Sequence, residues 1–311
     1  MKRILKGGMV LDGEGGPPRR ADVAIDGPRI VAIGEDLALA DAEIHDVSGL
    51  TVAPGFIDTH THDDGALLVD PGLAPKTSQG VTTVVVGNCG IGLAPVSRPQ
   101  VEGMGLPALA GKAGTFASFA DYLAAVTAAK PAVNVVPLMG HTTLRQEVMG
   151  DTGRAASSSE IARMATLLDA AMQAGAAGLS TGLYYGAANS ASTAEVVALA
   201  MVAAKHGGLY TTHLRDEEDS VTEAMEEAFT IGRAAGIPVL LSHHKVCGRR
   251  NWGRAQETLA RIAASRMVQP HSDAISPMSR PFISGWGADH ATRTAIEPSQ
   301  RFGIRAVEEA A

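Results

Sequence analysis

The spacing of apolar positions changes near residue 54. Over residues 2 to about 50, short clusters of β-branched residues are separated by turns rich in glycine and proline, such as residues 13–18. This pattern is typical of a small β unit. After Pro54 and Gly55, apolar strand-like runs alternate with amphipathic helical stretches. Such alternation is typical of βα units around a parallel sheet.

The apolar runs after residue 50 predict six strands, each four to seven residues long. Each run is bounded by residues that favour turns, and each precedes a stretch with helical periodicity. The predicted strands are residues 52–57, 81–86, 133–139, 176–179, 209–212 and 237–241.

The helix ends carry local signals. At three predicted helix starts a serine stands three residues before a glutamate, the pattern of a capping box in which hydroxyl and carboxylate satisfy free backbone N–H groups reciprocally. These serines are Ser157, Ser192 and Ser220. The helices that follow are predicted to stop where a glycine can adopt the left-handed conformation of a C-terminal cap. These glycines are Gly175, Gly207 and Gly236.

Six βα repeats favour a (β/α)₈ barrel over a dinucleotide-binding fold. The latter requires a Gly-x-Gly-x-x-Gly turn after its first strand, and no predicted strand is followed by one. We therefore expect an α/β protein of the TIM-barrel type, with residues 1–52 as a separate small β part and residues 53–311 as the barrel.

Composition and charge limit the classes of binding partner that the chain can have. The chain has 311 residues, 45% of them hydrophobic, and a net charge of −7, with Lys and Arg scattered. This gives no basic footprint for nucleic acid or for an anionic membrane, so a small-molecule substrate is expected. Cys89 and Cys247 cannot build a disulfide framework, and the N-terminus has no signal-peptide core. We expect a soluble enzyme of the reducing cytoplasm.

Candidate ligands for a metal ion gather at one end of the predicted barrel. A barrel carries its chemistry at the carboxyl ends of its strands, and these residues stand at or just after such ends. His60 and His62 are two positions apart, so their imidazoles would share one face if the strand continued to them. The full set is His60, His62, Cys89, His141, His213, His243 and His244.

Five motifs along the chain, four of which contain members of this set, resemble the D-aminoacylase branch of the amidohydrolase superfamily. The resemblance extends over residues 1 to about 265. It implies a deformed (β/α)₈ barrel with a small β-sandwich, zinc as the cofactor, and hydrolysis of N-acyl-D-amino acids. The motifs are Pro-Gly-Phe-Ile-Asp-Thr-His-Thr-His-Asp-Asp at 54–64, Gly-Asn-Cys-Gly at 87–90, Ser-Thr-Gly-Leu-Tyr-Tyr at 180–185, Thr-His-Leu-Arg at 212–215 and Leu-Ser-His-His-Lys at 241–245.

The resemblance also implies roles for individual residues. A tightly held zinc would be bound by Cys89, His213 and His243, and a second, weaker site by His60 and His62 together with Cys89. Thiolate plus two imidazoles is a normal zinc set that leaves a fourth position open for water. The alternative for the cysteine is a small buried hydrophobe, which its place after the strand disfavours.

Four further residues have open or implied roles. Because His243 and His244 are adjacent, only one should face the barrel mouth, and we expect His244 to pack or to form a supporting hydrogen bond. His141 could orient substrate or simply satisfy loop carbonyls. Lys245 and Tyr185 match family residues that contact the substrate α-carboxylate; the alternative is a solvated lysine and a tyrosine at the rim.

The last 46 residues depart from the family pattern. The tripeptide Ser272-Asp273-Ala274 resembles a catalytic motif of the eighth strand, which implies that Asp273 is the general base. The simplest account is an internal deletion with a shortened C-terminus; a frameshifted or unrelated tail is the rival. With one strand missing, an edge would be exposed, and we expect weak stability, low activity and possible self-association.

Two other functions remain open. One is hydrolysis of a cyclic amide, as in dihydroorotases and hydantoinases. It is the weaker interpretation, because those enzymes bridge two metals with a carboxylated lysine where this chain has residues 178–181, Gly-Leu-Ser-Thr. The other is a zinc-binding remnant without activity, which would bind the metal but turn over no substrate.

Overall fold

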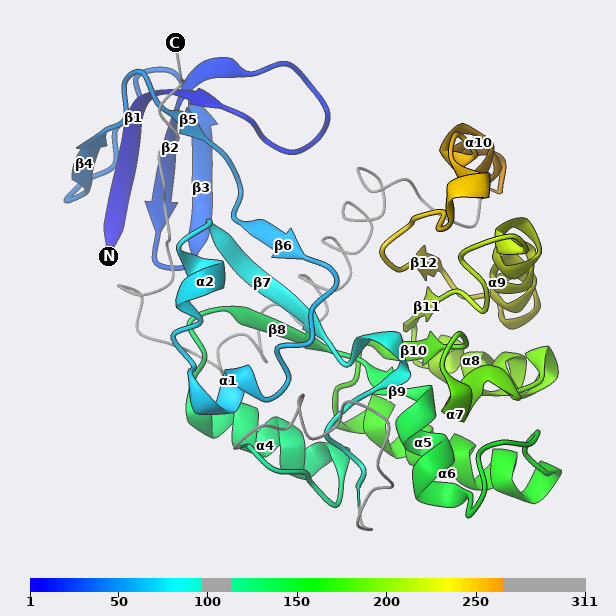
Figure 1. Cartoon of the computed structure of the whole chain (residues 1–311). Helices are drawn as coiled ribbons and strands as arrows, with labels where there is room; N and C mark the ends of the chain where they lie inside the picture. Colours follow the sequence, from blue (N-terminus) through cyan, green and yellow to red (C-terminus); the bar gives the residue numbers. More distant parts are fainter. Residues whose placement is uncertain (97–112, 266–311) are drawn as a thin grey trace.

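The computed structural model describes residues 1–96 and 113–265 (Figure 1). Asp273 and the rest of the last 46 residues lie outside these ranges. Within them, no helix is long and apolar enough to cross a membrane.

The N-terminal residues form a five-stranded sheet that lies apart from most of the helices (Figure 1). The strand order is β3-β2-β1-β4, and β5 pairs with the end of β1. Its own small core includes Leu5, Val23 and Ile25. The strands are β1 (Lys2–Val10), β2 (Arg19–Asp26), β3 (Arg29–Gly34), β4 (Glu43–Asp46) and β5 (Thr51–Val52).

The rest of the described chain is built on parallel strands in two sheets, and within each sheet every strand pairs with the next one along the chain. One sheet has the order β6-β7-β8 and the other β12-β11-β10-β9, and only Leu138 separates β8 from β9. Sequential parallel pairing of this kind is the arrangement of a (β/α) barrel wall. The strands are β6 (Phe56–Asp58), β7 (Val81–Val86), β8 (Asn134–Pro137), β9 (Met139–Gly140), β10 (Gly178–Gly182), β11 (Leu209–His213) and β12 (Val239–Leu241).

Helices follow these strands and bury the main core between themselves and the sheets. Amphipathic helices such as α9 supply apolar residues, including Met225 and Phe229, to that core. The helices are α1 (Ala66–Val69), α2 (Ala74–Thr77), α4 (Phe119–Ala129), α5 (His141–Val148), α6 (Ser158–Ala174), α7 (Gly186–Asn189), α8 (Thr193–Lys205), α9 (Val221–Ala235) and α10 (Ala255–Ala264), with single 3₁₀ turns η1 (Asn88–Gly90) and η2 (Arg249–Asn251).

The predicted strand positions are confirmed in outline and corrected in detail. Strand 81–86 has the predicted bounds. The single strand predicted at 52–57 is wrong, because Ala53, Pro54 and Gly55 interrupt it. β5, before the break, pairs in the small sheet, whereas β6, after it, pairs with β7. Proline lacks the N–H that a continuous ladder would need.

The capping boxes divide into three cases. Ser157 and Glu160 form the predicted reciprocal pair. Ser192 accepts from the backbone of Glu195 as predicted, but no reciprocal bond forms, because that carboxylate is bound to buried side chains instead. At Ser220 the prediction is wrong: its hydroxyl makes no cap bond.

Candidate metal centre

Cys89 lies in a tight turn directly after β7. Its φ of 55° and ψ of 24° are left-handed values that a non-glycine residue seldom adopts. The flanking motif makes this turn possible, because a Cβ at Gly87 would lie 2.2 Å from the carbonyl oxygen of Leu138. A Cβ at Gly182 would lie 2.2 Å from the carbonyl oxygen of Cys89 itself. Glycine at both positions lets the turn sit against β9 and β10.

Two imidazoles converge on this cysteine from neighbouring strands. His213 ends β11, and Thr212 pairs with Leu241, so His243 follows β12 at the same edge of the sheet. The Sγ of Cys89 lies 3.7 Å from Nδ1 of His213 and 3.6 Å from Nε2 of His243. His243 also has a left-handed φ, 32°. Two of the three residues are therefore held in strained conformations, as is common at functional sites.

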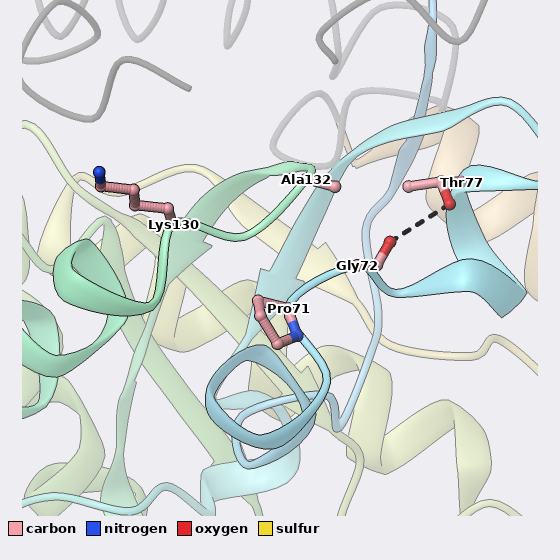
Figure 2. Close-up of a pocket in the computed structure, with 5 residues that line it drawn as sticks. All are labelled: Pro71, Gly72, Thr77, Lys130 and Ala132. Atoms are coloured by element: carbon pink, nitrogen blue, oxygen red, sulfur yellow. Dashed lines mark hydrogen bonds between the residues drawn. The ribbon is translucent and has the colours of Figure 1, made fainter. Parts of the chain in front are cut away.

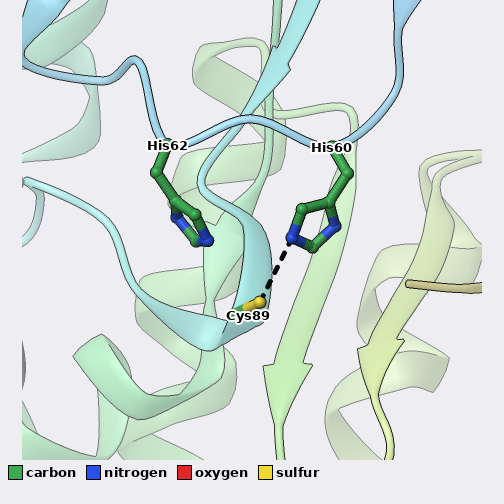
Figure 3. A group of neighbouring side chains, drawn as sticks. All are labelled: His60, His62 and Cys89. Atoms are coloured by element: carbon green, nitrogen blue, oxygen red, sulfur yellow. Dashed lines mark hydrogen bonds between the residues drawn. The ribbon is translucent and has the colours of Figure 1, made fainter. Parts of the chain in front are cut away.

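A second group shares the same cysteine. Nε2 of His60 lies 3.3 Å from Sγ of Cys89, and the rings of His60 and His62 are 5.4 Å apart (Figure 3). β6 ends at Asp58, so the histidines belong to the loop after the strand, not to the continued strand that would put them on one face. They nevertheless lie close to one another. His62 is exposed, whereas Cys89 is only 2% exposed.

These separations suit a tetrahedral metal ion. In each group the ligand atoms lie within 4.8 Å of one another. With zinc bonds of about 2.3 Å to sulfur and 2.0–2.1 Å to nitrogen, tetrahedral geometry puts the two ligand atoms about 3.6 Å apart. The observed distances from Sγ of Cys89 to the ring nitrogens of His213 and His243, 3.7 and 3.6 Å, match that separation. The donor set Cys-His-His therefore fits zinc.

Electrostatics point the same way. Burial raises the pKa of the Cys89 thiol to about 12, which a hydrogen bond from Tyr185 only partly offsets. A cation against the sulfur would offset the cost of a buried thiolate. Burial, helped by the neighbouring His243 and His62, lowers the pKa of His60 to about 4. Its imidazole is thus neutral near pH 7, the form that binds metals.

A glutamate that the sequence analysis did not identify lies behind both imidazoles. Oε1 of Glu217 is 3.0 Å from Nδ1 of His243, and Oε2 is 3.3 Å from Nε2 of His213. Burial raises the pKa of Glu217, but hydrogen bonds from His213, His243 and Lys245 outweigh it and hold that pKa below its usual range. Glu217 lies in the loop after β11, where the sequence has no periodic signal that could have revealed it.

The two predicted substrate contacts lie at the same place. The ammonium of Lys245 contacts Glu217, and its Nζ lies 3.0 Å from Nδ1 of His243. The ring of Tyr185 is 4.8 Å from that of His213, and burial raises the pKa of its phenol to about 12, so it remains a hydrogen-bond donor. Tyr184 stacks on His213 at 5.5 Å and is half exposed.

The other two histidines have bonding partners outside the ligand groups. Nε2 of His244 bonds to the hydroxyl of Thr258 on α10, at 2.9 Å, as expected for a supporting contact. His141 is fully buried, and its Nε2 lies 2.9 Å from Glu195, which also binds Arg145. Because it is fully buried and paired with Glu195, this imidazole is not placed to orient substrate.

A separate pocket of about 400 Å³ lies at the opposite end of the strands. Segments that precede β7 and β8 in the chain line this pocket. Within it, the hydroxyl of Thr77 donates to the carbonyl of Gly72 (Figure 2). No ligand-type cluster of histidine, cysteine or acidic residues lines it. The lining residues are Pro71, Gly72, Thr77, Lys130 and Ala132.

Comparison with known sequences identifies close relatives. The sequence profile of the amidohydrolase family matches residues 43–287. N-acyl-D-aspartate deacylase of Alcaligenes xylosoxydans xylosoxydans is 50% identical over 271 residues, which are 86% of this chain and 54% of the relative. D-aminoacylase of the same organism is 47% identical over 285 residues, 91% of this chain and 57% of the relative. The chain spans about half the length of these curated relatives.

Solved structures agree with the sequence comparison. A crystal structure of D-aminoacylase is 49% identical with a TM-score of 0.81, and covers 85% of this chain and 56% of that one. N-acyl-D-glutamate deacylase of Bordetella bronchiseptica, complexed with zinc and a phosphonate inhibitor, is 36% identical with a TM-score of 0.80, and covers 96% of this chain and 72% of that one. D-hydantoinase, at 16% identity and a TM-score of 0.52, shares the fold.

Proposed function

The chain belongs to the amidohydrolase family, as its sequence motifs predicted, and from this membership we propose that it is a zinc-dependent hydrolase of N-acyl-D-amino acids. The observation that carries the proposal is the convergence of His213 and His243 on Cys89 at the spacing of a tetrahedral zinc site. Relatives at 47% to 50% identity that act on N-acyl-D-aspartate or are D-aminoacylases support the substrate class.

We assign the tighter zinc to Cys89, His213 and His243, and a second, weaker site to His60 and His62 together with Cys89. Burial supports this ranking. His213 is only 6% exposed, whereas His62 is exposed. A buried site excludes water from competition with its ligands, so it should retain the ion more strongly.

A bound zinc ion would polarise the scissile carbonyl and lower the pKa of water toward neutrality. The remaining work falls to side chains. Asp273 would take the proton from the attacking water and deliver it to the leaving amine nitrogen. The ammonium of Lys245 has three N–H donors, so it can hold Glu217 and still donate to the substrate α-carboxylate. The phenol of Tyr185 would provide a second donor to that carboxylate.

Racemic substrates test the proposed reaction. The zinc-loaded chain is incubated with racemic N-acetylmethionine, N-acetylaspartate and N-acetylglutamate, and chiral chromatography identifies the free amino acid. We expect release of the D-amino acid only. Release of the L-enantiomer alone would refute the substrate assignment, and ring opening of a hydantoin with no release from linear amides would favour the cyclic-amide alternative. Zinc bound without any turnover would favour an inactive remnant.

Asp273 provides an internal check on the mechanism. Replacing Asp273 with Asn keeps the size of the side chain but removes the base, so kcat should fall by about 10²- to 10⁴-fold while zinc content stays unchanged. An unchanged kcat would exclude Asp273 as the general base.

A further inference from the structure

Glu217 touches the two principal imidazoles on the sides that face away from the cysteine. Its Oε1 lies 3.0 Å from Nδ1 of His243, and its Oε2 lies 3.3 Å from Nε2 of His213. The opposite ring nitrogens, Nε2 of His243 and Nδ1 of His213, face Sγ of Cys89. The side chain of Glu217 is only 7% exposed, so water competes little for its oxygens.

A neutral imidazole carries one N–H and one lone pair, and the neighbours of the ring decide which nitrogen has which. An ionised carboxylate only accepts hydrogen bonds. A carboxylate at 3.0 Å from Nδ1 of His243 and at 3.3 Å from Nε2 of His213 therefore favours, in each neutral ring, the tautomer with its hydrogen on that nitrogen. That leaves the lone pairs of His213 and His243 directed toward Cys89, where a metal ion requires them.

We propose that Glu217 is a positioning residue that fixes opposite tautomers in His213 and His243, and so determines how tightly the chain binds zinc. This inference rests on the metal centre of the proposed function. One carboxylate can act on both ligands, because its Oε1 faces the ring of His243 and its Oε2 faces the ring of His213.

The neighbouring lysine makes this control necessary. Nζ of Lys245 lies 3.0 Å from Nδ1 of His243 and could donate a hydrogen bond to it. The hydrogen of His243 would then move to Nε2, the nitrogen that faces Cys89, and block metal binding there. Glu217 prevents this in two ways, since it accepts from Nδ1 and also pairs with the ammonium of Lys245.

The test replaces Glu217 with Gln, which keeps the shape but has one acceptor oxygen and one N–H₂ group. The amide can accept from one imidazole, while its donor group opposes the N–H of the other. Zinc affinity, measured by competition with a chelating dye, should fall about 10- to 100-fold. Glu218→Gln is the matched control, because it removes the same charge from the adjacent, exposed residue, and its affinity should equal that of the wild type.

A second measurement separates positioning from folding. Nitrogen-15 spectra of labelled histidines in the zinc-bound wild type should show hydrogen on Nδ1 of His243 and on Nε2 of His213. In Glu217→Gln, cobalt substituted for zinc should show an altered absorption spectrum. Glu217→Asp keeps the charge on a shorter side chain, cannot span both rings, and should lose affinity as well; it replaces the glutamine variant if that one does not fold.

Unchanged zinc affinity in a folded Glu217→Gln, or the opposite tautomers in the wild type, would overturn the proposal. None of these measurements uses a substrate. A chain that shows the expected effects of Glu217 but hydrolyses no N-acyl-amino acid would therefore refute the proposed function and leave the role of Glu217 intact.

Discussion

The ammonium of Lys76 lies 2.7 Å from Oδ2 of Asp58, the residue that ends strand β6. The same ammonium is 3.3 Å from Asp63, so one cation holds two carboxylates that flank the loop of His60 and His62. Oδ1 of Asp58 also accepts from the backbone N–H of His60. Lys76 on α2 thus anchors both ends of the loop that carries the second ligand group.

Replacing Lys76 with Met should weaken the second metal site selectively. Without the cation, the two carboxylates repel each other and the loop loses its anchor, so affinity for a second zinc should fall about 10-fold or more, as for other residues that orient ligands. The tighter zinc that we propose at Cys89, His213 and His243 should bind as before. Zinc titration followed by calorimetry resolves the two events. Lys205→Met, an exposed lysine on α8, is the control and should change neither.

Cys89 should be indispensable for both ligand groups. Cys89→Ala removes the only anionic donor that the groups share, so purified protein should lose its tightly bound zinc, about one ion per chain in the wild type. His60→Ala should cause a smaller loss, because it touches only the weaker site. Atomic absorption measures the content. Full zinc occupancy in Cys89→Ala would refute the assignment.

The sequence predicted which candidate residues come together, because each lies at or after the end of a strand whose apolar pattern is clear. Once the strands are parallel and sequential, residues such as Cys89 and His213 must meet at one edge. Glu217 was missed because it lies in a loop, where no periodicity indicates the direction of a side chain. The capping box at Ser192 failed for a related reason: the tertiary pairing of Glu195 with Arg145 outweighs a local bond.

The buried pair of His141 and Glu195 predicts loss of stability in acid. Burial lowers the pKa of His141, although Glu195 partly opposes it. Burial raises the pKa of Glu195, but hydrogen bonds from His141 and Arg145 bring it to about 2. Both folded-state values lie below the unfolded ones, so the unfolded chain binds more protons as pH falls. The contribution of this pair to the free energy of unfolding should be full above pH about 6.5. It should decline below that pH, because His141 binds a proton more readily in the unfolded chain, and decline further from about pH 4.5 toward 2 as Glu195 does the same.

Urea unfolding of the metal-free protein at several pH values measures this decline. His141→Gln removes one titrating group, so its stability should fall less steeply than that of the wild type between pH 7.5 and 5.5. The difference should approach about 1.4 kcal/mol per pH unit at most, the value for one proton. Parallel curves for the two proteins would show that His141 does not control acid stability.

Gly182 should be required for metal binding, although it offers no ligand. A Cβ there would lie 2.2 Å from the carbonyl oxygen of Cys89 and 2.7 Å from the ring of Tyr185. The ring can turn aside, but the carbonyl belongs to the strained turn that aims the thiol, so Gly182→Ala must displace Cys89. We expect zinc affinity to fall about 10- to 100-fold, the loss typical when the support of a ligand is altered. Gly186→Ala is the matched control.

Gly186 lies four residues further along, at the start of α7, and nothing approaches within 4 Å of its Cβ position. Its replacement should leave zinc affinity unchanged, and because alanine favours a helix, the fold should not suffer. Thermal unfolding of both metal-free variants separates a displaced turn from a general loss of structure. If Gly182→Ala binds zinc as tightly as Gly186→Ala does, then the backbone at Cys89 is free to shift. The thiol would in that case be aimed by the metal itself, and not by the packing of the turn against β10.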